Sequence, residues 1–128
     1  MDKPKSIVVC VTRQFSCEHL IVEGASYARE NGLALTVVHV VGLNDNFFEN
    51  TTDGEALDAL FTIAKQHGGV IQLVKSDDVF SSIVKCAHDS NAVMLLVGKS
   101  PVQGRSSLYW RLGQALPGVD VIESKARQ

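Results

Sequence analysis

The sequence is poor in cysteine and has no long hydrophobic run. Its 128 residues include three cysteines, with no Cys-x-x-Cys pair and no cysteine–histidine spacing typical of zinc sites. This argues against a disulfide framework or a structural zinc site and favours a reducing compartment, so we expect a cytoplasmic protein. No apolar run approaches the roughly 20 residues of a membrane-spanning helix. The first apolar stretch, Ile7–Val11, is too short for a signal peptide.

Strong charge of either sign is also absent. The formal net charge is −2 and the isoelectric point is 6.0, which gives the molecule no electrostatic reason to bind a nucleic-acid polymer. Aromatic residues make up 6% of the chain, and the pair Tyr109-Trp110 lacks the interleaved basic residues of a single-strand-binding platform. We expect this pair to pack a helix against the sheet. With 45% apolar and 20% charged residues, the sequence predicts one folded domain over residues 1–128.

The motifs of common enzyme classes are missing. There is no GxxxxGK[ST] loop, no GxGxxG after the first apolar run, no GxSxG elbow and no HExxH. The carboxylates are scattered, and Asp77 or Asp78 is most simply a helix cap. We therefore expect no catalytic residue, no metal site and no enzymatic activity.

Five apolar runs alternate with four segments of helical period. Short strand–helix connections of this kind predict parallel strands, right-handed crossovers and a three-layer α/β sandwich. The continuous Val- and Ile-rich runs suit strands that are buried on both faces. The predicted strands are Ile7–Val11, Leu35–Val41, Val70–Val74, Val93–Val97 and Val119–Ile122. The predicted helices span about Ser16–Asn31, Thr52 to Gly68, a segment that starts after Asp77 or Asp78, and about Ser107–Leu116.

Polar residues in the runs predict the order of the strands. The first and fourth runs are wholly apolar, which suits the sheet centre, whereas Gln72 and Asp120 mark the third and fifth runs as edges. The predicted order is therefore 3-2-1-4-5, with a reversal between the first and fourth strands. Ligands of open α/β sheets bind outside the carboxyl ends of the strands at such a reversal. The loops 12–16 and 98–107 are thus the candidate site.

These loops are suited to an anion. No acidic residue occurs between Asp89 and Asp120, and Ser106 and Ser107 lie at the start of a predicted helix, where free amides favour phosphate. A solvated basic loop is the alternative interpretation. The loop residues that would contact phosphate are Arg13, Gly98, Lys99, Ser100, Arg105, Ser106 and Ser107.

His39 interrupts the Val-rich second strand near its carboxyl end, on the side of the candidate site. Two interpretations stay open for it, a hydrogen-bonded core histidine and a ligand contact.

Several segments resemble universal stress proteins. They are Lys5–Val11, Ala28–Gly32, Leu35–Val40, Ser76–Val79 and Ser90–Lys99. The most similar subtype is the stress-protein-like domain of Kdp-type potassium-sensing histidine kinases, on the marks Asp77-Asp78-Val79, Val97-Gly98-Lys99 and Trp110 leading to Gly118–Val121. The resemblance implies an adenine nucleotide alpha hydrolase-like fold. Both a stand-alone protein and a piece of a larger sensor kinase are compatible with the sequence.

Two ligand motifs of the family can be followed in this chain. ATP-binding members place an aspartate after the first strand, where this chain has Thr12, and follow Gly98 with a glycine where it has Pro101. The later glycine corresponds to Gly113, two residues late, and the ATP motif is therefore degraded. The cyclic di-AMP pattern SxS-x20-FTAxY places Thr12 and Gln14 at the two serines and His39 at its last position.

The resemblance implies a non-enzymatic regulatory module of the stress response that binds ATP, AMP or cyclic di-AMP. It also implies a homodimer formed through the last strand, with Val119, Val121 and Ile122 at the interface. A ligand-free dimeric interaction module and a weak nucleotide hydrolase are the alternatives.

Overall fold

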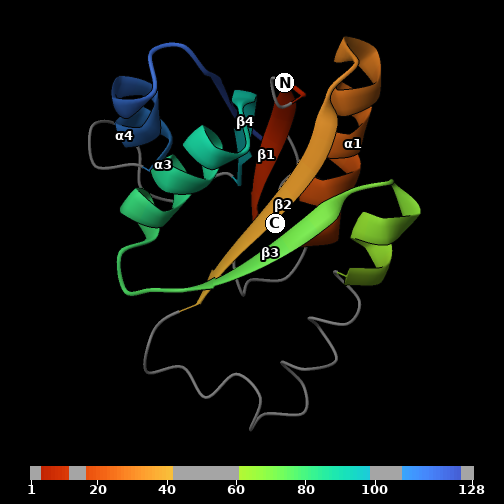
Figure 1. The fold of residues 1–128 in the computed structure, drawn as a ribbon, viewed down its shortest axis with the longest axis horizontal. Helices are drawn as coiled ribbons and strands as arrows, with labels where there is room; N and C mark the ends of the chain where they lie inside the picture. The colour runs from red at the N-terminus through yellow and green to blue at the C-terminus, as the bar shows by residue number, and fades with distance from the viewer. Residues whose placement is uncertain (1–3, 12–16, 42–60, 99–107, 125–128) are drawn as a thin grey trace, which may run out of the picture.

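A computed structural model of the chain describes residues 4–11, 17–41, 61–98 and 108–124. Its centre is a five-stranded parallel sheet in the order β3-β2-β1-β4-β5 (Figure 1). This confirms the predicted fold class and the predicted strand order. The strands are β1 (Ser6–Val11), β2 (Ala34–Val41), β3 (Val70–Lys75), β4 (Ala92–Val97) and β5 (Asp120–Glu123).

Helices cover both faces of the sheet. One face packs against α1 (Cys17–Asn31) and a helix at residues 61–66, and the other packs against α3 (Val79–Asp89) and α4 (Leu108–Ala115) (Figure 1). The guanidinium of Arg111 lies 4.4 Å from the ring centre of Phe80 and so joins α4 to α3. None of the described helices is both long and apolar enough to span a membrane.

The central strand β1 shows why its sequence is continuously apolar from Ile7 to Val11. All six of its residues are buried. Ile7 and Val9 belong to the core under α1, whereas Val8 and Cys10 belong to the core under α3 and α4. Because successive side chains of a strand point to opposite faces, a strand with helices on both sides must be apolar throughout. Each such valine or isoleucine stabilises the fold by about 1.5–3 kcal/mol.

The helix boundaries follow local chemistry. Gly32 ends α1 at φ +64°, and Gly68 follows the helix at 61–66 at φ +73°, a conformation that favours glycine. Asp78 is the N-cap of α3, because its Oδ1 accepts from the amide of Ser81 at 3.0 Å and its Oδ2 from the hydroxyl of Ser81 at 2.8 Å. These two hydrogen bonds lower the pKa of Asp78. Of the two aspartates, Asp78 is therefore the cap.

Two details differ from the sequence expectation or fall outside the structure. Tyr109 and Trp110 are 40% and 39% exposed, so the expectation that they pack against the sheet is wrong. Leu112 of α4 and Leu116, the residue directly after α4, are buried in the core under α3 and α4 instead. The predicted start of a helix at Thr52 lies outside the described residues.

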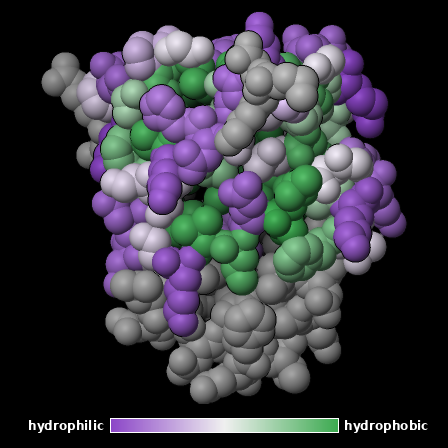
Figure 2. All heavy atoms as spheres, viewed as in Figure 1, coloured by the Kyte–Doolittle hydropathy of each residue, from purple (hydrophilic) through white to green (hydrophobic). Residues whose placement is uncertain are grey.

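The edge strand β3 is less well covered than the other strands. Val70 is 61% and Leu73 is 39% exposed. Figure 2 shows hydrophobic atoms at the surface over this part of the sheet. Its exposure agrees with the edge position that Gln72 predicts.

Candidate functional site

The sheet reverses its strand order between β1 and β4, which are hydrogen-bonded neighbours. After β1 the chain continues to α1 on one face, and after β4 it continues to α4 on the other. Val9 pairs with Leu96, so both strands end at the same edge, and β2 ends there as well because its His39 pairs with Val11. This edge is the switch point at which α/β sheets place their ligands.

Most of the predicted ligand-binding residues lie outside the described residues. These are Thr12, Arg13, Gln14, Lys99, Ser100, Arg105, Ser106 and Ser107. The structure describes the strand ends that carry them, Val11 and Gly98, and the predicted contacts His39 and Gly113.

His39 lies in the core at the switch point. It is 1% exposed and stands between Val11 of β1 and Leu73 of β3 in the sheet register. The alternation of side chains along β2 places it on the same face as Leu35 and Val37, which pack under α1. A buried imidazole at this position adds a polar group to an otherwise apolar strand end.

The two glycines of the predicted site differ in their surroundings. Gly98 follows β4 directly and is half-buried. Gly113 lies inside α4, five residues after its first residue, and a Cβ added to it would meet no atom within 4 Å. The amide of a helix-interior residue is bonded to the preceding turn, so Gly113 has no free amide for a phosphate.

A partly buried polar pair, which the sequence pattern does not predict, lies next to the carboxyl end of β4. The hydroxyl of Ser124 donates to Oε1 of Glu23 at 2.8 Å, and the amide of Ser124 donates to the carbonyl of Val97 at 2.7 Å. The second carboxylate oxygen of Glu23 is buried and has no hydrogen-bond partner among the described residues. The pair therefore fixes the end of β4, directly before Gly98, and connects it to α1.

The position of Glu23 in α1 is the only sequence signal for this pair. Glu23 lies three residues after Leu20 and four before Tyr27, and both of these contact the core under α1. Spacings of three and four place residues on one helix face. A glutamate between two core residues at those spacings is therefore a candidate buried carboxylate.

The described cysteines are not suited to nucleophilic chemistry. Cys10 and Cys86 are free and buried in the core under α3 and α4. Burial raises the pKa of both thiols, which keeps them protonated and unreactive at neutral pH. The described residues also contain no group of three or more His, Cys, Asp or Glu side chains placed to hold a metal ion.

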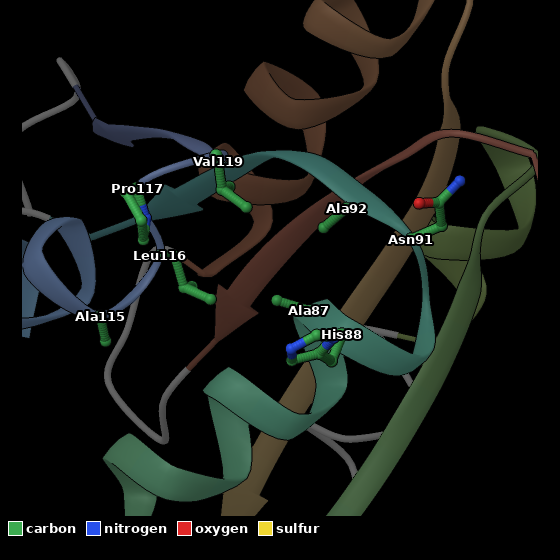
Figure 3. A pocket seen from close by; sticks show the side chains of 9 residues that line it. Ala87, His88, Asn91, Ala92, Ala115, Leu116, Pro117 and Val119 are labelled. Carbon is green, nitrogen blue, oxygen red and sulfur yellow. The ribbon is translucent and has the colours of Figure 1, made fainter.

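A separate cleft of about 310 Å³ lies at the opposite end of the sheet. It is formed where α3 and α4 end and where β4 and β5 begin, and Figure 3 shows its lining side chains. In that view Leu116 and Val119 approach from one side, and Ala87 and His88 of α3 from the other. The sequence does not predict this cleft, because the strand pattern indicates a ligand site only at the carboxyl ends of the strands.

Comparison with solved structures identifies the fold. A universal stress protein from Burkholderia pseudomallei aligns with a TM-score of 0.66 and 19% identity, over 94% of this chain and 96% of that one. A universal stress protein solved in complex with cAMP aligns with a TM-score of 0.68 and 16% identity, over 96% and 98%. One from Archaeoglobus fulgidus in complex with dAMP gives a TM-score of 0.63 and 21% identity, over 93% and 96%.

These similarities show the fold and its strand order, which are those of universal stress proteins and of the adenine nucleotide alpha hydrolase-like class. No family model and no curated protein matches the sequence.

Proposed function

We propose that this protein is a regulatory module of the universal stress protein type that binds an adenine nucleotide at the carboxyl ends of β1 and β4. The observation that carries the proposal is the strand order, which places the reversal between two buried central strands. Two proteins of this fold were solved with cAMP or dAMP bound, which supports the ligand class.

The proposed contacts divide by their chemistry. Arg13, Lys99 and Arg105 would balance the phosphate charge, and the hydroxyls of Ser100, Ser106 and Ser107 would donate hydrogen bonds to phosphate oxygens. Gly98 lets the backbone approach the ligand. The base would lie near the ends of β1 and β2, beside Thr12, Gln14 and the buried His39. Gly113 is left out of this assignment because its amide lies inside α4.

The proposal is for binding rather than turnover. Neither the sequence motifs nor the described side chains supply a positioned acid and base for hydrolysis. The degraded ATP motif, with Thr12 and Pro101 at two of its positions, favours AMP or cyclic di-AMP over ATP. It also supports the second candidate, an interaction module that binds no nucleotide. Within the family we propose the Kdp-type sensor domain as the nearest subtype and the cytoplasm as its location.

We further propose a homodimer formed through the edge strand β5. The side chains of Val119 and Val121 pack against the core under α3 and α4, and that of Ile122 packs against the core under α1. The partner would therefore pair with the backbone edge of β5 rather than with an apolar face. Light scattering coupled to size exclusion should give twice the 13.9 kDa mass of one chain.

Calorimetric titration tests the proposed ligand. Purified protein is titrated with cyclic di-AMP, ATP, AMP and cAMP, and we expect micromolar binding of at least one of them. Lys99→Ala and Arg105→Ala should each weaken binding by about tenfold, since each removes a charge-assisted contact to phosphate. Lys85→Ala on α3 is the matched control and should leave the affinity unchanged. The absence of heat and of thermal stabilisation with all four nucleotides would favour the ligand-free interaction module.

A further inference from the structure

We propose that the cleft between the ends of α3 and α4 is a second ligand site, and that it takes a small organic cation with an apolar body of about one ring and an ammonium end. Ala92, the first residue of β4, lines this cleft, whereas Val97 at the other end of the same strand borders the switch point. The two sites therefore lie at opposite ends of the sheet. This inference does not depend on nucleotide binding.

The interior of the cleft favours an apolar body. Seven of the nine lining residues are Ala, Leu, Pro, Gly or Val, and none is lysine, arginine, aspartate or glutamate. Ala87 and Leu116 are buried, so the lining continues the core under α3 and α4. A volume of about 310 Å³ is at the lower end of small-molecule sites. One ring with a short substituent fills that space.

Hydrogen bonds to backbone carbonyls hold the two sides of the cleft in place. On the α3 side, the amide of Ser90 donates to the carbonyl of Cys86 at 2.9 Å, and the hydroxyl of Ser6 donates to the carbonyl of Ser90 at 2.7 Å. On the α4 side, the amide of Val119 donates to the carbonyl of Leu116 at 3.0 Å. The cleft is therefore formed before a ligand enters, which lowers the entropy cost of binding.

The electrostatics of the cleft favour a cation. Both α3 and α4 end here, and the carboxyl end of a helix carries roughly half a negative charge. Pro117 has no N–H, so the carbonyl of Gly113 four residues earlier receives no helix hydrogen bond from it. Exposed Asp89 and Asp120 directly follow lining residues. The negative helix ends and the neighbouring carboxylates would attract a positive group at the mouth, and a carboxylate or phosphate would be repelled.

Two polar side chains belong to the lining. The imidazole of His88 and the carboxamide of Asn91 come from the end of α3 and the turn after it. Asn91 has φ +54°, a left-handed conformation that asparagine adopts more readily than most residues. Figure 3 shows its carboxamide beyond Ala92 and directed away from the other lining side chains, so His88 is the polar side chain placed to contact a ligand.

Three probes of equal shape and different charge test the proposal. We would record amide spectra of the ¹⁵N-labelled full chain near pH 7.5 with benzylamine, benzyl alcohol and benzoate. Benzylamine should shift the amides of residues 87–92 and 115–119, with a dissociation constant on the order of a millimolar for a ligand of this size. Benzoate should leave these amide signals unchanged, and benzyl alcohol should give shifts of intermediate size. Equal shifts with benzoate, or benzylamine shifts confined to other residues, would overturn the proposal.

A variant that fills the cleft gives an independent check. Ala115 is exposed and lines the cleft, so Ala115→Phe should weaken benzylamine binding at least about tenfold without disturbing the fold. Gln114→Phe adds the same ring at the preceding residue of α4, which is exposed and outside the lining, and this variant should bind benzylamine like the unchanged protein. Benzylamine binding that survives Ala115→Phe at full strength would show that the probe sits elsewhere.

Discussion

Asp78 determines where α3 begins, and its effect on stability should depend on pH. Its carboxylate accepts two hydrogen bonds from Ser81, which lower its pKa in the folded protein below the ordinary value of 3.8. The stabilisation is therefore complete above the pKa of the unfolded chain and is lost as the pH falls through the lower folded-state pKa. Asp78→Ala should lower the midpoint of thermal unfolding at pH 7, and this effect should shrink progressively as the pH falls below 3.8.

The adjacent aspartate is the control for this prediction. Asp77 does not cap α3, so Asp77→Ala should lower the unfolding midpoint at pH 7 less than Asp78→Ala does. Thermal unfolding followed by circular dichroism between pH 2 and 7 measures both variants. A destabilisation by Asp78→Ala that is the same at pH 2 and pH 7 would contradict the capping role of the ionised carboxylate.

Single residues also show the limit of sequence reasoning. The sequence narrows the cap of α3 to two aspartates, because capping depends on local spacing. The contact between Glu23 and Ser124 joins residues 101 positions apart, and no local pattern predicts which serine a glutamate meets. The sequence leaves the role of His39 open for the same reason, since a strand pattern indicates that the side chain is buried but not which groups surround the imidazole.

At the scale of elements, two helical glycines should respond in opposite ways to the same change. A Cβ on Gly24 of α1 would press against Cγ2 of Val9 in β1, whereas a Cβ on Gly113 of α4 would meet open space. Gly24→Ala should therefore destabilise the protein by about 1–3 kcal/mol through overpacking. Gly113→Ala should stabilise it by about 0.5–1 kcal/mol through helix propensity.

Denaturant unfolding of the two variants measures both effects, and each variant controls for the other. The Gly113→Ala variant should also bind nucleotide as the unchanged protein does, because the glycine lies within α4 and is left out of the proposed site. A loss of stability in Gly113→Ala would show that its surroundings are more crowded than the structure indicates, and a loss of nucleotide affinity would return Gly113 to the site.

The strands and their order follow from the sequence because burial on both faces demands continuous apolar runs. β4 is wholly apolar, β1 is apolar from Ile7 to Val11, and neither is an edge strand, whereas Gln72 and Asp120 mark the edges. For α4 the sequence does not decide which residues are buried, because it offers two apolar pairs, Tyr109 with Trp110 and Leu112 with Leu116. Leu112 and Leu116 are four residues apart and so lie on one side of the helix, and these two are buried.

At the scale of the whole molecule, the sheet separates two proposed sites with opposite electrostatics. The carboxyl ends of β1 and β4 lead into loops whose sequence is basic, and the amino ends of β4 and β5 meet the carboxyl ends of two helices. The sequence indicates the first site because the reversal of strand order follows from the strand pattern. The second site depends on how two helix ends converge, which the pattern does not contain.

The central claim is that an adenine nucleotide binds at the switch point. We would map amide shifts of the ¹⁵N-labelled protein with ATP, AMP and cyclic di-AMP in turn. At least one nucleotide should shift the amide signals of Val11, His39, Val97 and Gly98. The amide signals of Ala92 and Val119, at the far end of the sheet, should stay unchanged. Unchanged amides at the strand ends with all three nucleotides, or shifts centred on the cleft of α3 and α4, would contradict it.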